Sequence, residues 1–198
     1  MRWTALLVAA AVALGTAACS EDPNSLSAQA KAGDRKGYVS GDGSVEKIAA
    51  AERQEPVRLE GETVDGGTWS LKDAAGKVVV VNVWGSWCGP CVAEAPDLQK
   101  AWDGLSKAGK PVQFVGIDFR EDPARGAAFL RANKITYPSL SDESGVLILG
   151  LQGKAPTVPT TLVLDPTGRI AARVNGEVTA STLTGLVDDV LAEAQGGS

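Results

Sequence analysis

The sequence predicts an α/β domain in which helices flank a mixed β-sheet. Two nearly continuous apolar and β-branched runs, residues 77–84 and 112–119, have the composition of strands covered on both faces. Apolar residues between these runs recur at helical spacing, and this β–α–β order implies parallel strands joined by a right-handed crossover. Residues 160–174 contain two further strands around an Asp-Pro-Thr-Gly turn, which adds an antiparallel edge to the sheet.

The remaining elements are placed by their turn and helix signals. An N-terminal β-hairpin is expected within residues 57–71, where alternating residues surround an Asp-Gly-Gly turn. The crossover helix is expected over residues 91–108, with Gly109 as its stop. A central α/β insert follows, and it begins with a helix from Pro123 to about Asn133. The chain then continues with an extended piece and a short apolar helix within residues 135–151, and with a closing helix over residues 179–194.

Composition and charge exclude several classes of function. The chain has 198 residues, a formal net charge of −5, three cysteines and no histidine. Nucleic acid is not expected as a partner, because phosphate binding needs a basic face. The lack of histidine removes Ser/His and Cys/His catalytic pairs as well as histidine-ligated zinc, copper and haem. The chemistry must therefore use thiols, carboxylates or backbone groups, and no metal is expected.

Residues 1–19 have the layout of a signal peptide. Arg2 provides a short positive region, an apolar stretch follows, and small residues lead to Cys19. The ending Gly-Thr-Ala-Ala-Cys resembles the lipobox of bacterial lipoproteins, although Thr16 stands where that family usually has an aliphatic residue. An ordinary secretory signal cut near Ala18 is the alternative. Lipidation of Cys19 is favoured because it leaves an even number of thiols in an exported chain.

The mature chain is expected to consist of a tether and one domain. Residues 20–55 are rich in small and charged residues, bury little surface and are expected to form a flexible tether. Within it, residues 45–52 have the composition of one or two helical turns. The composition changes at Pro56, and residues 56–195 are expected to form the domain.

The segment Cys88-Gly89-Pro90-Cys91 carries the strongest chemical signal. Cys88 lies where the first buried strand has ended and the next helix begins, and Pro90 suits the first helical position. The Cys88 thiol therefore faces the free N–H groups and the positive end of a helix, which favour the reactive thiolate. Cys91 lies one turn into the helix, is more enclosed and suits the role of a resolving thiol.

Metal binding and a structural disulfide are the two alternatives for this pair. A structural zinc site needs four cysteine or histidine ligands, which two cysteines do not supply. A disulfide that closes so short a loop restrains the unfolded chain least. Redox chemistry is therefore the favoured interpretation, with the disulfide Cys88–Cys91 as the redox-active group and no other cofactor.

The sequence resembles a known protein family at two motifs. The motif Trp-Gly-Ser-Trp-Cys-Gly-Pro-Cys at residues 84–91 and the motif Ala-Pro-Thr-Val-Pro-Thr-Thr at residues 155–161 resemble the thioredoxin superfamily. The sequence is more similar still to the TlpA/ResA-like thiol-disulfide oxidoreductases, which are membrane-tethered bacterial proteins. The resemblance covers residues 56–194, including the hairpin and the insert at residues 123–141, and implies a thioredoxin-like fold.

The resemblance implies a role for each residue of the two motifs. Cys88 would be the nucleophile, Cys91 the resolving thiol, and Trp87 the exposed ring beside them. Pro159 would be a cis-proline opposite the cysteine pair, and Val158 would offer its backbone to an extended substrate. A trans proline that starts an edge strand is the alternative for Pro159.

Glu94 is a candidate acid–base residue because it lies three residues beyond Cys91 on the same helix. In the family, an acid at this place tunes the thiols or moves protons, which suits a partly buried carboxylate. The alternative is a solvated glutamate early in a helix. Thioredoxin itself has an aspartate at the position of Asn82, whereas asparagine is usual there in the TlpA-like branch. Because asparagine cannot take up a proton, Glu94 is the better candidate for proton transfer.

The dipeptide between the cysteines favours a reductant. Gly-Pro is also the dipeptide of thioredoxin, whose potential is strongly reducing at about −270 mV. An exported reductant needs electrons from elsewhere, because its compartment is oxidising. The resemblance implies that a membrane thiol-transporter supplies them and that the substrates are disulfides of exported proteins such as apocytochrome c. An exported disulfide-forming oxidase, a redoxin-type peroxidase and a tethered metal-binding module are the alternative functions.

Overall fold

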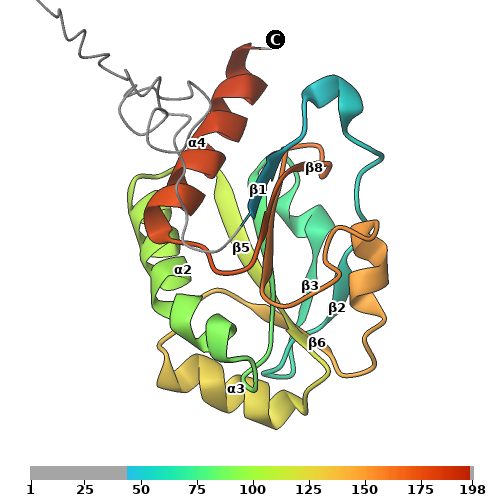
Figure 1. Ribbon diagram of the computed structural model, residues 1–198, viewed down its shortest axis with the longest axis vertical. Coiled ribbons are helices and arrows are strands. Elements are labelled where there is room, and N and C mark those ends of the chain that lie inside the picture. Colours follow the sequence, from blue (N-terminus) through green and yellow to red (C-terminus); the bar gives the residue numbers. More distant parts are fainter. Residues whose placement is uncertain (1–43, 197–198) are drawn as a thin grey trace, which may run out of the picture. The chain divides into compact units, whose positions relative to one another are not determined.

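A six-stranded mixed sheet forms the centre of the computed structural model, which describes residues 44–196 (Figure 1). The strands are β1 (Ser44–Lys47), β4 (Val78–Trp84), β5 (Val112–Phe119), β6 (Ser139–Asp142), β7 (Thr160–Leu164) and β8 (Ile170–Asn175). They are ordered β1-β8-β7-β4-β5-β6 across the sheet. Strands β4, β5 and β6 are parallel to one another, whereas β7, β8 and β1 are added by antiparallel pairing. The predicted mixed sheet is confirmed.

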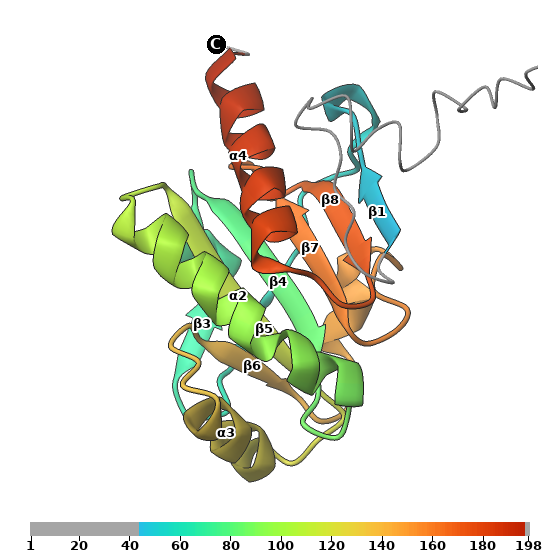
Figure 2. The same ribbon diagram turned by 60° about the vertical axis from the view of Figure 1, so that its left-hand side comes forward.

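Helices and short 3₁₀ segments cover the two faces of this sheet. The helices are α2 (Gly89–Lys107), α3 (Pro123–Ala132) and α4 (Ala180–Gly196), and the 3₁₀ segments are η1 (Ala50–Glu52), η2 (Leu71–Ala74) and η3 (Leu147–Leu151). Helices α2 and α4 lie side by side on one face (Figure 2). The hairpin β2 (Glu60–Glu62) and β3 (Thr68–Ser70) lies on the side away from α2 (Figure 1). In residues 44–196, none of the helices combines the length and the apolar character needed to cross a membrane.

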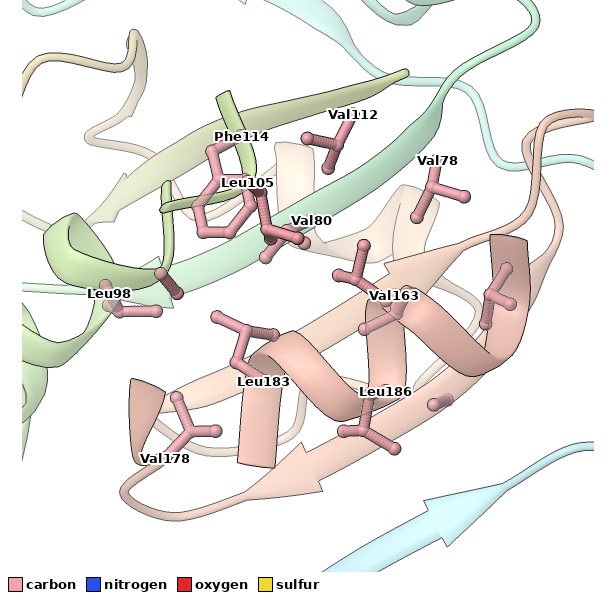
Figure 3. Packing of buried hydrophobic residues seen from close by; sticks show 14 of the residues in the cluster. Val78, Val80, Leu98, Leu105, Val112, Phe114, Val163, Val178, Leu183 and Leu186 are labelled. Atoms are coloured by element: carbon pink, nitrogen blue, oxygen red, sulfur yellow. The ribbon is translucent and has the colours of Figure 1, made fainter. Parts of the chain in front are cut away.

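Strand β4 is buried along its whole length and divides the core in two. Val80 points towards α2 and α4, where it packs with residues such as Leu98 and Leu183 (Figure 3). Val81 points the other way and belongs to a second cluster with Leu59 and Leu151, under the hairpin and η3. Burying a side chain of this kind contributes about 1.5–3 kcal/mol. The predicted strand with two covered faces is confirmed.

The predicted order of elements from the hairpin to α4 is confirmed, with small shifts. Helix α2 begins at Gly89, two residues before the predicted start. It ends before Gly109, which has a φ of 65°, a left-handed conformation that favours glycine. The short apolar helix is a 3₁₀ segment, η3, and the insert supplies α3 and the parallel edge strand β6.

The prediction of a flexible tether up to residue 55 is wrong for its last part. Strand β1 pairs with β8 in antiparallel register, from Ser44 opposite Asn175 to Lys47 opposite Ala172. The late hairpin of β7 and β8 is therefore not the edge of the sheet, as the sequence suggested, because β1 lies outside it. The predicted helical turns over residues 45–52 are a strand followed by the single 3₁₀ turn η1. The predicted signal peptide, Cys19 and residues 20–43 lie outside the described residues.

Arg53 explains how so polar a segment is fixed to the domain. Its side chain is almost fully buried, with an exposed fraction of 4%. The guanidinium donates to Asp165 at 3.1 Å, to the carbonyl oxygen of Ile48 at 3.0 Å, and to Glu193 of α4. Because a buried cation needs such partners, residues 44–55 belong to the domain, and the boundary predicted at Pro56 lies too late.

Candidate active site

The two cysteines form a disulfide at the first turn of α2. Cys88 is the N-cap residue of the helix, and its Sγ accepts a hydrogen bond from the backbone N–H of Cys91 at 3.2 Å. Pro90 occupies the first turn, where a missing N–H has no cost. Both side chains are buried, and Cys88 is the more accessible at 6% against 2% for Cys91. Cys91 is thus the more enclosed of the two, as expected, while the roles of Cys88 as the attacking thiol and Cys91 as the resolving thiol stay predictions.

The residues on either side of the Cys88–Cys91 segment in the sequence, Trp87 and Val92, are apolar and exposed. Trp87 is 55% exposed, and its Nε1 donates to the carbonyl oxygen of Phe119 at 3.3 Å, which fixes the ring in place. Val92, on the first turn of α2, is also exposed. Trp87 is thus the exposed ring that the sequence predicted, while its contact with a substrate remains a prediction.

The Val158–Pro159 peptide bond is cis, as the resemblance implied. Pro159 is buried, and Val158 is half-buried and packs against the cluster that contains Cys88 and Cys91. Val158, in the loop before β7, is therefore adjacent to the disulfide, although residues 92–157 separate it from Cys91 in the sequence. The alternative of a trans proline is excluded.

Glu94 is buried, with an exposed fraction of 2%, which rules out the alternative of a solvated glutamate. Asn82 of β4 donates to its Oε1 at 2.9 Å, and the backbone N–H of Val178 donates to its Oε2 at 3.0 Å. Burial raises the pKa of Glu94 to about 7, although these two hydrogen bonds lower it; the charges of Glu177 and Asp97 raise it further. Glu94 is therefore poised to gain or lose a proton near neutral pH.

Asn82 connects Glu94 to the region behind the cysteine pair. Asn82 and Cys91 both line a small cavity of about 10 Å³, together with Trp84 and Tyr137. Burial raises the pKa of Tyr137 above its ordinary value, with a further contribution from Glu94, so this phenol stays neutral. Within residues 44–196, no hydrogen bond joins Glu94 to either sulfur of the disulfide.

Two acids beside the turn that carries Cys88 were not found from the sequence. Glu121 accepts hydrogen bonds from the backbone N–H of Ser86 at 3.0 Å and from the Ser86 hydroxyl. Asp118, at the end of β5, is fully buried beside it. A usable signal was the parallel pairing of β4 with β5, because it places Asp118 opposite Trp84, where β4 ends.

Residues 44–196 hold no group of three or more histidine, cysteine, aspartate or glutamate side chains arranged to bind a metal ion.

Comparison with known proteins identifies relatives that cover most of the domain. The model of the AhpC/TSA family matches residues 53–173. The thiol:disulfide interchange protein HelX of Rhodobacter capsulatus is 34% identical over 146 residues, which are 74% of this chain and 76% of HelX. The thiol-disulfide oxidoreductase ResA of Bacillus cereus is 29% identical over 127 residues, which are 64% of this chain and 71% of ResA.

Solved structures give the same result. A DsbF homologue from Corynebacterium diphtheriae superposes with a TM-score of 0.68 and 36% identity, covering 75% of this chain and 94% of that one. A secreted thiol-disulfide isomerase from Corynebacterium glutamicum has a TM-score of 0.68 and 33% identity, covering 75% of this chain and 95% of that one.

Proposed function

The chain belongs to the AhpC/TSA family and is a thiol-disulfide oxidoreductase of the TlpA/ResA-like type with a thioredoxin-like fold, and from this premise we propose that it reduces disulfides in exported proteins. The observation that carries the proposal is the Cys88–Cys91 pair at the start of α2, next to the buried acid Glu94. Disulfide-containing proteins are its class of substrate.

The proposed reaction is a pair of thiol-disulfide exchanges. The Cys88 thiolate attacks one sulfur of the substrate disulfide, that bond breaks, and the second substrate sulfur leaves as a thiolate and takes up a proton. Cys91 then loses its proton and attacks the sulfur of Cys88, which releases the first substrate sulfur as a thiolate. Two electrons have passed to the substrate, and the Cys88–Cys91 disulfide has formed.

The amide dipoles of α2 and the carboxyl group of Glu94 supply the acid–base chemistry of this cycle. The free N–H groups of the first turn stabilise negative charge on Cys88, to whose Sγ the N–H of Cys91 already donates. Glu94 is the proposed acceptor of the proton that Cys91 loses, because its pKa of about 7 suits transfer near neutral pH. Asn82 holds its carboxylate in position. The exposed Trp87 and the backbone of Val158 are proposed to contact the substrate.

The direction of electron flow is proposed to be towards the substrate. The Gly-Pro dipeptide places no basic side chain between the cysteines that would stabilise the thiolate of an oxidant. The negative charge of Glu94 also disfavours thiolate, which makes the reduced pair a better electron donor. A dithiol of a membrane thiol-transporter is the proposed source of the two electrons. The resemblance to TlpA/ResA-like proteins supports the C-x-x-C-H segment of apocytochrome c as one substrate.

The proposed location is the outer face of the cell membrane. The signal-peptide layout and the lipobox-like ending support export and lipidation of Cys19. The similarity to a secreted isomerase of Corynebacterium glutamicum supports an extracytoplasmic site of action. Labelling of cells with a lipid precursor, compared between the wild type and Cys19→Ala, tests the anchor.

We expect the Cys91→Ser variant to trap its substrate. Without the resolving thiol, the mixed disulfide on Cys88 persists, and non-reducing electrophoresis of an exported protein fraction should show a covalent adduct that dithiothreitol removes. The matched control is Cys88→Ser, which keeps one cysteine of the pair but lacks the nucleophile and should give no adduct. If the reduced Cys91→Ser protein forms no adduct either, thiol-disulfide exchange is not its activity.

Equilibration with glutathione tests the direction of electron flow. We expect a potential near that of thioredoxin, about −270 mV, because the two proteins share the dipeptide between the cysteines. The fraction of the Cys88–Cys91 disulfide at each glutathione ratio is read by alkylation and mass spectrometry. A potential close to about −120 mV would identify a disulfide-forming oxidase and overturn the reductant proposal.

A further inference from the structure

Asp118 is a buried carboxyl group that the proposed reaction does not use. It lies at the end of β5 with an exposed fraction of 0%. Within the described part of the chain, neither of its oxygens receives a hydrogen bond from a donor. An ionised carboxylate without a partner is costly in such a place, so the acid is favoured in its uncharged form.

The side chain of Asp118 occupies the space beside Gly126 in helix α3 that a larger residue would fill. A Cβ atom at Gly126 of α3 would lie 1.9 Å from Oδ2 of Asp118, a distance that no side chain can accept. Glycine inside a helix is less favourable than alanine. The close approach of α3 to Asp118 therefore depends on a residue that is otherwise unfavourable for the helix.

Glu121 is the group within reach of Asp118. Its carboxyl group is close enough to form a hydrogen bond with Asp118, and between two carboxyl groups such a bond exists only when one carries a proton. Burial raises the pKa of Asp118 to about 8, and the charges of Glu121 and Asp122 raise it further. Because these effects favour the protonated form of Asp118, we take Asp118 as the donor and Glu121 as the acceptor of this hydrogen bond.

Glu121 connects this acid pair to the active-site turn. It accepts from the backbone N–H of Ser86 at 3.0 Å and from the Ser86 hydroxyl. At the end of β5, the carbonyl oxygen of Phe119 accepts from Trp87 Nε1. The turn between β4 and α2, which leads into Cys88, is thus held by the end of β5 and the loop that follows it.

We propose that Asp118 is a positioning residue, which as a neutral acid donates a hydrogen bond to Glu121 and so fixes the turn before Cys88. The role in catalysis rests on the exchange reaction proposed above, whereas the hydrogen bond itself can be tested in its absence. When Asp118 ionises, its negative charge repels that of Glu121. This repulsion displaces the Glu121 carboxylate and weakens the hydrogen bonds that it accepts from Ser86. The rate of exchange should then depend on this proton, in addition to those of Glu94 and the thiols.

Within residues 44–196, the groups whose charges shift the pKa of Asp118 include no cation. The charged groups that act on it are Glu121 and Asp122, both of the loop after β5. Its neighbours from β4, β6, α3 and the hairpin segment are not ionisable, namely Trp84, Ser141, Gly126 and Val64.

The backbone amide of Ser86 reports this hydrogen bond directly. We expect its ¹⁵N–¹H resonance in the oxidised Glu94→Gln protein to titrate with a midpoint near pH 8. The disulfide removes the thiol titrations in this state, and the substitution removes the titration of Glu94. In Asp118→Asn, an amide that always donates replaces the neutral acid, so the titration should vanish and the resonance should stay at its low-pH position. Asp103→Asn, at a half-exposed position of α2 where Asp103 pairs with Lys107, is the matched control and should leave the midpoint unchanged.

A second variant keeps the test decisive if Asp118→Asn does not fold. Glu121→Gln removes the like charge and should move the midpoint below pH 8, because one cause of the raised pKa is gone. A Ser86 resonance that does not titrate above pH 6, or a midpoint that neither variant changes, would overturn the proposal.

Exchange kinetics separate positioning from mere stability. The ratio of the wild-type rate to the Asp118→Asn rate should fall several-fold between pH 7 and pH 9, while titration of the thiols cancels in the ratio. A constant ratio would mean that Asp118 does not act on Cys88. If exchange itself is absent in both proteins, the proposed function is wrong, but the Ser86 titration still decides the hydrogen bond.

Discussion

Glu94→Gln is expected to slow the resolution of the mixed disulfide about 100-fold at pH 8, since a positioned acid–base group contributes about 10²–10⁴-fold to rate. Glutamine preserves the shape of the side chain and can still pair with Asn82, but it cannot accept the proton of Cys91. The carboxyl group of Glu94 has a pKa of about 7, so it is protonated and inactive as a base below that pH. The wild-type rate should therefore rise through pH 7, and the variant should lose this limb. Rapid-quench measurement of the covalent adduct gives both rates.

The control for this prediction is Glu177→Gln, the same chemical change at an exposed neighbour whose charge acts on Glu94. It should alter the rate less than twofold.

The free energy of unfolding of Glu94→Gln, compared with that of the wild type, shows whether the variant is folded. Because the pKa of Glu94 is raised from 4.5, its proton stabilises the folded protein at low pH, and this contribution is lost as the pH rises through 7. Glu94→Gln should thus be more stable than the wild type at pH 9 but not at pH 5. A variant that resolves the adduct within threefold of the wild type, with the same pH profile, would exclude Glu94 as the base.

The centre of the fold and the cysteine pair were predictable because local sequence alone determines them. An apolar run as continuous as residues 78–84 has no stable place except a strand covered on both faces. The Cys-Gly-Pro-Cys segment follows this strand and contains a proline suited to the first turn of a helix, so the position of Cys88 at the N-cap also follows from sequence. The cis bond before Pro159 was predicted from the resemblance to a family, and nothing local required it.

Features that depend on tertiary contacts were not predictable in the same way. Strand β1 has the polar sequence Ser-Val-Glu-Lys, and only its pairing with β8 makes it a strand. The sequence named Glu94 as a candidate but could not tell whether it was buried. Asp118 was missed altogether, because its burial depends on the close approach of α3 at Gly126, a contact that no local pattern shows.

Arg53→Met is expected to lower the free energy of unfolding by about 3 kcal/mol, near the lower end of the range for a broken buried ion pair. Both partners of the Arg53–Asp165 pair are almost fully buried, with exposed fractions of 4% and 5% for their side chains. Burial alone would raise the pKa of Asp165, but hydrogen bonds from Thr167, Arg169 and Arg53 lower it overall, so the group is ionised. The loss of Arg53 leaves this carboxylate with fewer donors and removes the anchor of residues 44–55. Arg169 continues to pair with Asp165, which limits the loss. Urea denaturation at pH 7 measures the difference.

Lys72→Met is the matched control for this substitution, because it also replaces a paired cation with methionine. Nζ of Lys72 lies 3.6 Å from Oε2 of Glu60, and the two side chains are 86% and 68% exposed. A surface ion pair of this kind contributes at most about 1 kcal/mol, so this variant should have nearly the same free energy of unfolding as the wild type.

The pH dependence of the free energy of unfolding distinguishes Arg53→Met from Lys72→Met further. The lowered pKa of Asp165 means that its contribution is present at neutral pH and is lost as the pH falls below about 3.8, the unperturbed value. The deficit of Arg53→Met should therefore shrink in acid. Equal stability of Arg53→Met and the wild type at pH 7 would show that residues 44–55 are not an integral part of the domain.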